Sequence, residues 1–299
     1  MIVEQAPQGA YTAALSADGS LSLMSTFAQQ VTLWQLQPTP KIRFRWQQQS
    51  QNNIFVAKFA PEHQFAITAS RHDFAVWSTQ TGHSLGFYAI KQSVIRDIAL
   101  SASGTTVLAG LENGHVLAIN LRTGRRLEFL GHKEAINAVC LSANGRYALT
   151  AGNGGKVLLW DTQTAQIIIQ LQLNSRVTQI ALSSDGHYLF AADSHHTAQI
   201  YAIPSGQKIS RLNIHTRQQI FSSARFVDQG KWLVTGSPNR RIQLWDTHTG
   251  QLLQNWQVGL NHAHRPASAV VYDATIDNNG QLISASSTGL VEYWHINQH

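Results

Sequence analysis

The sequence has little formal charge and only one cysteine. Asp, Glu, Lys and Arg make up 13% of the 299 residues, about half the share of an ordinary soluble protein. The single Cys140 cannot close an intramolecular disulfide, and its setting AVCLS indicates a core strand rather than an activated nucleophile. A chain of this length buries enough surface to be stable without cross-links. The fold must therefore rest on packing.

Several motifs are also absent. No GxSxG, P-loop, HExxH or GxGxxG followed by a helix occurs, so we expect no enzymatic activity and no cofactor. No run approaches the roughly 18 apolar residues of a membrane helix, and the start MIVEQAPQG lacks the basic region and apolar core of a signal peptide. We expect a soluble protein. If a leader has been removed ahead of Met1, the cell envelope is slightly favoured, and the cytoplasm is the alternative.

What the sequence does contain is a repeat. Two stretches are nearly alike, KVLLWDTQTAQ at 156–166 and RIQLWDTHTGQ at 241–251. The same strand pattern recurs with an anchor at its end, and the seven anchors are Trp34, Trp77, Asn120, Trp160, Tyr201, Trp245 and Trp294. A turn of the SADG type precedes six anchors at a nearly constant distance, and APEH at 60–63 occupies the same place in the second unit. Two markers in one phase indicate a repeat of about 40 to 45 residues.

Each unit is typical of four short strands divided by turns. In the fourth unit the strands are AINAVCLS, RYALTAG, KVLLWD and QIIIQLQL, with no helical period. A Gly after Thr or Ser, at positions 82, 124, 206 and 250, permits the hairpin between the third and fourth strands, with Ala165 as the exception. The third strand is apolar on both sides of its alternation, which favours a sheet packed between two neighbours.

Four-stranded units of this length with a Trp-Asp dipeptide resemble the bacterial WD40-repeat proteins. The resemblance covers nearly the whole chain and implies an all-β fold, a single seven-bladed β-propeller over residues 1–299, as a monomer. The last unit stops at its third strand, VEYW. We therefore expect residues 2–6 (IVEQA) to supply the closing outer strand of the C-terminal blade, because pairing the two ends removes exposed edges.

The family's blades carry a hydrogen-bonded set of Trp, Ser or Thr, His and Asp, and the resemblance places parts of it here. The three units with the first three members contain, in turn, His132, Thr150 and Trp160; His215, Thr235 and Trp245; and His264, Ser284 and Trp294. At the acidic position these units have Gly154, Asn239 and Thr288. We expect none of the seven units to have Asp there.

Asp161 and Asp246, the acids of the two Trp-Asp dipeptides, are not a catalytic pair. They occupy equivalent places in separate blades, far apart on one rim, whereas a carboxylate couple needs its groups about 5 to 10 Å apart. Each is expected to organise the turn that follows, since Asp side chains bond backbone two residues on.

One face of such a ring is expected to be basic and rich in histidine. The loops between second and third strands, and those between blades, contain the candidate partner-binding residues Arg71, His72, Lys133, Lys156, His195, His196, Arg217, Arg240, Arg241, His262, His264 and Arg265. The opposite face contains Asp18, Glu62, Asp185, Asp228 and Asp277. We hypothesise that the basic face binds one or more acidic protein partners, more tightly as pH falls. Exposed loops are polar in any protein, and this plainer interpretation stays open.

The second hypothesis is a ligand- or metal-binding propeller, with His195, His196, His262 and His264 at the channel mouth. No Cys or carboxylate lies at metal-ligand spacing, so no metal is expected. Nucleic acid is not expected as a partner either, because the loops lack a lysine-rich run or a repeated aromatic platform.

Overall fold

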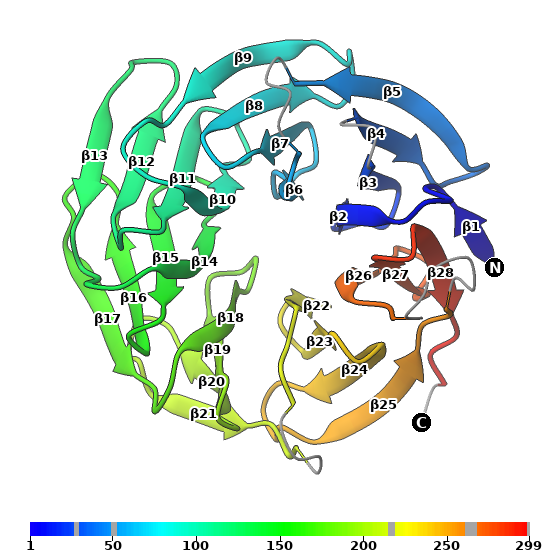
Figure 1. Cartoon of the computed structure of the whole chain (residues 1–299). Helices are drawn as coiled ribbons and strands as arrows, with labels where there is room; N and C mark the ends of the chain where they lie inside the picture. The colour runs from blue at the N-terminus through cyan, green and yellow to red at the C-terminus, as the bar shows by residue number, and fades with distance from the viewer. Residues whose placement is uncertain (27–29, 49–52, 215–218, 261–267, 298–299) are drawn as a thin grey trace.

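The computed structural model describes residues 1–26, 30–48, 53–214, 219–260 and 268–297. In this part of the chain, 28 strands form seven four-stranded antiparallel sheets, and there is no helix. Figure 1 shows the sheets as the blades of a closed ring, with the first strand of each blade at the centre. The seven-bladed propeller expected from the repeat is confirmed.

The first three blades follow the chain in order. Blade 1 contains β2 (Ala10–Leu15), β3 (Leu21–Thr26), β4 (Gln30–Gln35) and β5 (Lys41–Gln47). Blade 2 contains β6 (Val56–Phe59), β7 (Phe65–Ala69), β8 (Asp73–Ser78) and β9 (Ser84–Ala89). Blade 3 contains β10 (Ile95–Leu100), β11 (Thr106–Leu111), β12 (Val116–Asn120) and β13 (Arg126–Phe129).

The next three blades repeat this arrangement. Blade 4 contains β14 (Ile136–Leu141), β15 (Tyr147–Gly152), β16 (Lys156–Asp161) and β17 (Ile167–Gln172). Blade 5 contains β18 (Val177–Leu182), β19 (Tyr188–Asp193), β20 (Ala198–Ala202) and β21 (Lys208–Arg211). Blade 6 contains β22 (Ser223–Val227), β23 (Trp232–Gly236), β24 (Arg241–Asp246) and β25 (Leu252–Gln257).

Blade 7 joins the two ends of the chain. Its inner strands are β26 (Val271–Ile276), β27 (Leu282–Ser286) and β28 (Leu290–Trp294), and the outer strand is β1 (Ile2–Glu4). Val3 lies opposite Val291 in an antiparallel pair. The expected closure is thus confirmed, with a strand shorter than residues 2–6, because the backbone NH groups of residues 5 and 6 both donate to the Gly289 carbonyl.

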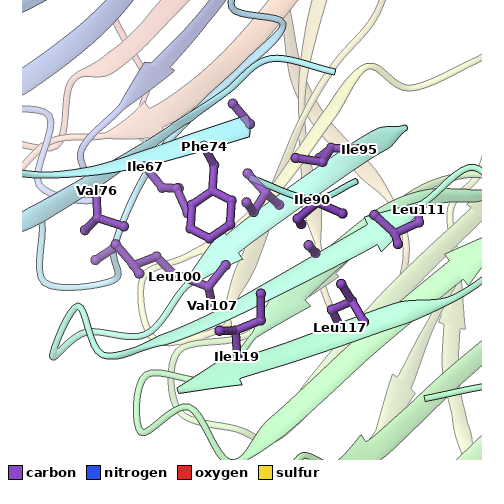
Figure 2. Close-up of a cluster of buried hydrophobic side chains, with 14 residues drawn as sticks. Ile67, Phe74, Val76, Ile90, Ile95, Leu100, Val107, Leu111, Leu117 and Ile119 are labelled. Carbon is purple, nitrogen blue, oxygen red and sulfur yellow. The ribbon is translucent and has the colours of Figure 1, made fainter. Parts of the chain in front are cut away.

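Hydrophobic contacts between blades hold the ring together. Figure 2 shows one cluster, in which Ile67 and Phe74 of blade 2 pack with Leu100 and Val107 of blade 3. The third strands are buried on both faces as expected, since Val157 to Trp160 of β16 are at most 2% exposed. Aromatic rings also stack between neighbours: Trp46 lies 5.0 Å from Trp77, centroid to centroid.

The hairpins between third and fourth strands need a left-handed residue. Gly82, Gly124, Gly206 and Gly250 have φ between 70° and 76°. Ala165, the exception in the sequence, adopts the same conformation with φ of 61°. Because a Cβ makes this region unfavourable, the turn geometry is dictated by the blade and not by the local residue.

Candidate partner-binding face

The hydrogen-bonded set of blade 4 forms as the family resemblance implies. His132 Nε2 lies 2.9 Å from Thr150 Oγ1, and Trp160 Nε1 donates to the same oxygen over 3.3 Å. The Trp245 and Trp294 indoles likewise donate over 2.9 Å to Thr235 and Ser284. These contacts tie the second and third strands of each blade, so they are structural. His215 lies outside the described residues.

Blade 2 corrects the expectation that no unit has Asp in this set. Trp77 Nε1 donates to Thr68 Oγ1 over 2.9 Å, the Thr68 hydroxyl donates to Gln48 over 3.0 Å, and Gln48 donates to Asp73. Gln48 therefore takes the place of the histidine. Alignment missed Asp73 because it precedes Trp77 by four residues, whereas Gly154 precedes Trp160 by six.

The acids of the Trp-Asp dipeptides organise turns, as expected. Asp161 Oδ1 accepts from the backbone NH groups of Gln163 and Thr164 at 2.8 and 3.2 Å, and its Oδ2 accepts from Arg146 Nε at 2.8 Å. The bond from Arg146 and those from the backbone hold the pKa of Asp161 below its usual range. An ionised, fully bonded carboxylate of this kind is a structural element and not a general acid or base.

Every described residue of the expected basic face lies on one side of the ring. The antiparallel order puts the loops between second and third strands on the same side as the links between blades. Most of these side chains are exposed, and Lys156 and Arg240 are half-buried. Arg217, His262, His264 and Arg265 lie outside the described residues.

The cations of this face have few acidic partners. Among the described residues there are four ion pairs of Lys or Arg with a carboxylate and three contacts of His with a carboxylate, and none of them includes Arg71, Lys133 or Arg241. On the opposite face, Asp161 pairs with Arg146, and Asp185 contacts His187. Arg71, Lys133 and Arg241 thus form no ion pair within the described chain, although Glu112 and Glu134 lie in loops of the same face.

Arg240 differs from the other candidates. Its Nε and Nη2 donate to the Val258 carbonyl at 3.0 and 2.8 Å, which fixes the start of the link between blades 6 and 7. A change at Arg240 would therefore disturb a loop as well as remove a charge.

Sequence reasoning missed an aromatic residue and two cations on this face. Phe55, 43% exposed, stands before β6 with the Tyr11 ring edge-on at 5.9 Å and the Arg71 guanidinium 5.7 Å from its centroid. Arg96 and Arg176 are exposed where β10 and β18 begin. All three lie in or beside links between blades, which align poorly from unit to unit. Aromatic and arginine side chains are enriched among the residues that anchor protein interfaces.

The central channel contains two partly exposed ion pairs and a cavity of about 480 Å³. Lys58 Nζ of blade 2 lies 2.7 Å from Asp97 of blade 3, and Asp97 Oδ2 accepts from the Val139 NH of blade 4 at 2.8 Å. The same three-blade arrangement recurs across the ring. Arg225 of blade 6 pairs with Asp273 of blade 7 at 2.5 Å, and Asp273 accepts from the Leu15 NH of blade 1 at 2.9 Å.

We call each of these arrangements an ion bracket. Both acids follow a register shift near the start of their strands, between Ile95 and Asp97 and between Val271 and Asp273. The bulge turns the carboxylate towards the axis. Because each acid contacts a cation of one neighbouring blade and a backbone NH of the other, it holds three blades together.

The histidines do not assemble a metal site within the described chain. His195 and His196 are exposed, with ring centroids 6.0 Å apart. No group of three or more His, Cys, Asp or Glu residues converges among the described residues. His262 and His264, the other members of the second hypothesis, fall outside them.

The fold and the Trp-centred hydrogen bonds define a WD40-type propeller, and residues 206–246 match the model of the WD domain, G-beta repeat. Residues 34–211, more than half of the chain, match the model of the family Eukaryotic translation initiation factor eIF2A, and the chain belongs to that family. The family is named after the eukaryotic factor. No curated protein matches the chain. A bacterial origin stays a prediction.

WD40 propellers are commonly protein-interaction scaffolds and are typically not enzymes. No helix in the described residues has the length and apolar character needed to span a membrane.

Proposed function

We propose that this propeller is a non-catalytic scaffold that binds an acidic protein segment on its basic face. The supporting observation is the set of exposed cations without carboxylate partners, Arg71, Lys133, Arg176 and Arg241 among the described residues. Loops on a rigid scaffold are where binding commonly resides. Phe55, exposed beside Arg71, offers an apolar anchor within the same surface.

The charge pattern sets the expected behaviour of binding. Unpaired surface cations accelerate association with an anionic partner, and this acceleration falls as salt screens the charges. Histidine side chains in general gain positive charge between pH 8 and pH 5, and His72, His195 and His196 are exposed on this face. Binding is therefore expected to tighten from pH 7.5 to pH 5.5 and to weaken with ionic strength.

The test uses poly-L-glutamate and a panel of fluorescent acidic peptides as probes. The variant Arg71→Glu/Lys133→Glu/Arg241→Glu should weaken binding by at least tenfold at about 0.1 M salt, where the Debye length is about 10 Å. The matched control Lys41→Glu/Arg43→Glu/Lys208→Glu changes net charge equally on the exposed edges of β5 and β21. Equal loss in both variants would mean attraction by net charge alone, which contradicts a binding face.

A further inference from the structure

A cavity of about 910 Å³ lies on the face opposite the basic one and opens among the turns between first and second strands. Residues from these turns line it in six of the seven blades: Ala17, Pro61, Ala143, Ser184, Asp228 and Asn278. Its volume falls in the range of about 300 to 1,000 Å³ that is typical of small-molecule sites.

The walls of this cavity are mostly apolar. Tyr147 and Ile168 of blade 4 line it together with Ile203 of blade 5 and Trp232 of blade 6. Ile168 is 38% exposed, although it is an aliphatic residue in a strand. Apolar surface left open inside a concave site, with a few polar groups at its edge, is the composition of ligand pockets.

The mouth of the cavity is acidic. Asp228 and Asp277 line it directly, and Asp18, Glu62 and Asp185 lie on neighbouring turns. Two cations also lie at this end: Arg225, which lines the cavity, pairs with Asp273, and Lys231 Nζ lies 3.9 Å from Asp228. His63 and His187 lie beside Asp18 and Asp185. An acidic mouth over apolar walls focuses a field that attracts cations.

One aromatic residue of the wall already contacts a cation outside the cavity. The Lys231 ammonium lies 4.7 Å from the centroid of the Trp232 ring, which lines the cavity. Cations bind favourably over the face of an indole.

The mouth is preformed. Ser16 donates to Asp18 over 2.6 Å, and Asp277 accepts from the backbone NH groups of residues 279 and 281 at 2.9 and 2.8 Å. Asp185 is fixed in the same way by Ser183 and the NH of His187. These bonds hold the acids in place without a ligand, so little ordering entropy would be lost on binding.

We propose that this cavity is a binding site for a small organic cation with an apolar body. The apolar walls would contact the body, and the carboxylates at the mouth would face the charge. This site is separate from the basic face, and it neither requires nor excludes a protein partner there.

The probe pair tetraphenylphosphonium and tetraphenylborate tests this directly, because the two ions have the same shape and opposite charge. By isothermal titration calorimetry, the phosphonium should bind at one site with Kd below about 100 µM. The borate should bind at least tenfold more weakly. Equal binding of both ions, or binding of the borate alone, would overturn the proposal.

Two variants locate the site. Ile168→Ser should weaken phosphonium binding by about tenfold through lost apolar contact. The matched control is Ile167→Ser, because Ile167 is the adjacent residue of β17, is 43% exposed, and does not line the cavity. Thermal melting of both variants confirms that they fold. Equal weakening in both, or none in Ile168→Ser, would contradict the location.

The charge at the mouth is tested without disturbing a turn. Glu62→Gln/Asp228→Asn should weaken phosphonium binding by about fivefold, and Asn is compatible with the positive φ of 49° at Asp228. The control Glu112→Gln/Glu134→Gln removes equal charge from the basic face and should leave phosphonium binding unchanged. Binding that is indifferent to the first variant would contradict the role of the acids. Poly-L-glutamate binding, measured in parallel, reports the basic face separately.

Discussion

At the scale of single residues, different side chains hold the same hydroxyl in different blades. His132 contacts Thr150 in blade 4, and Gln48 contacts Thr68 in blade 2. Both contacts leave the Thr oxygen free to accept from a Trp indole. The position beside the Thr hydroxyl therefore requires a polar side-chain atom, but it does not require a titratable side chain.

His132 makes stability depend on pH. Burial, followed by the charge of Lys156, lowers its pKa to about 4, whereas a histidine in the unfolded chain titrates near 6.5. Between these values the unfolded state holds more protons, so the free energy of unfolding falls as pH drops from about 6.5 to 4, by up to about 3 kcal/mol. Above pH 6.5 this contribution is constant.

The variant His132→Gln, which copies blade 2, should remove this dependence. Denaturant unfolding at pH 7.5, 6, 5 and 4 measures it: the difference in stability between wild type and variant should shrink as pH falls. His248→Gln is the control, since His248 lies on the surface. A difference that stays constant over this range would contradict the assignment to His132.

At the scale of elements, the outer strand of blade 7 is the shortest of the seven outer strands. β1 has three residues, and its burial pattern shows only Val3 turned inwards. It nevertheless covers the edge of β28 and brings Ala6, 3% exposed, into the core shared with blade 1. A short strand therefore determines whether the ring is closed.

Removal of residues 1–8 should lower the melting temperature by about 10 °C, because an edge and several buried apolar groups become exposed. Val3→Asp should lower it by a smaller amount. Ile2→Asp is the matched control, since Ile2 is 64% exposed, and it should have almost no effect. An unchanged melting curve after the deletion would rule out closure by β1.

The elements could be predicted from the sequence better than the contacts between them. Trp160 and Trp245 mark the third strands because that strand is buried on both faces in every blade, and this constraint recurs at a fixed period. Ala165 could be assigned to a left-handed turn for the same reason, from its place in the repeat. A burial requirement that recurs in every blade can be recognised in the sequence as a repeated residue pattern.

The candidate site was predicted only in part. Arg71 and Arg241 were found because turns within blades align, whereas Phe55 and Arg176 lie in links that align poorly. Asp73 was missed because its turn differs in length from the others. The acidic cavity mouth was foreseen as a set of turn acids, but the apolar walls behind it come from strands of three blades and have no local signature.

At the scale of the whole molecule, the two ion brackets connect blades 2 to 4 and blades 6, 7 and 1. Lys58 and Asp97 could not be paired from the sequence, since 39 positions separate them and neither lies in a motif. The Lys58 side chain is 37% exposed, whereas Arg225 is 27% exposed. The second bracket is therefore less screened by water.

Asp273→Ala should cost about 3 kcal/mol of stability in denaturant unfolding, because it leaves the Arg225 charge and the Leu15 NH unpaired. Asp97→Ala should cost less, since water screens Lys58 better. Arg225→Met/Asp273→Ala should recover part of the loss, because the uncompensated charge is gone. If the double variant is no more stable than Asp273→Ala, the bracket is not an electrostatic unit.

Blade 5 is the one that neither bracket includes within the described chain. The ring thus contains two braced arcs of three blades, which meet directly between blades 1 and 2 and are separated on the other side by blade 5. Ile168 of blade 4 and Ile203 of blade 5 line the same cavity at one boundary of blade 5. A break in the chain beside blade 5 would leave the bracket of blades 2 to 4 within the N-terminal piece. The second bracket would instead join the two pieces, because Leu15 belongs to one of them and Arg225 and Asp273 belong to the other.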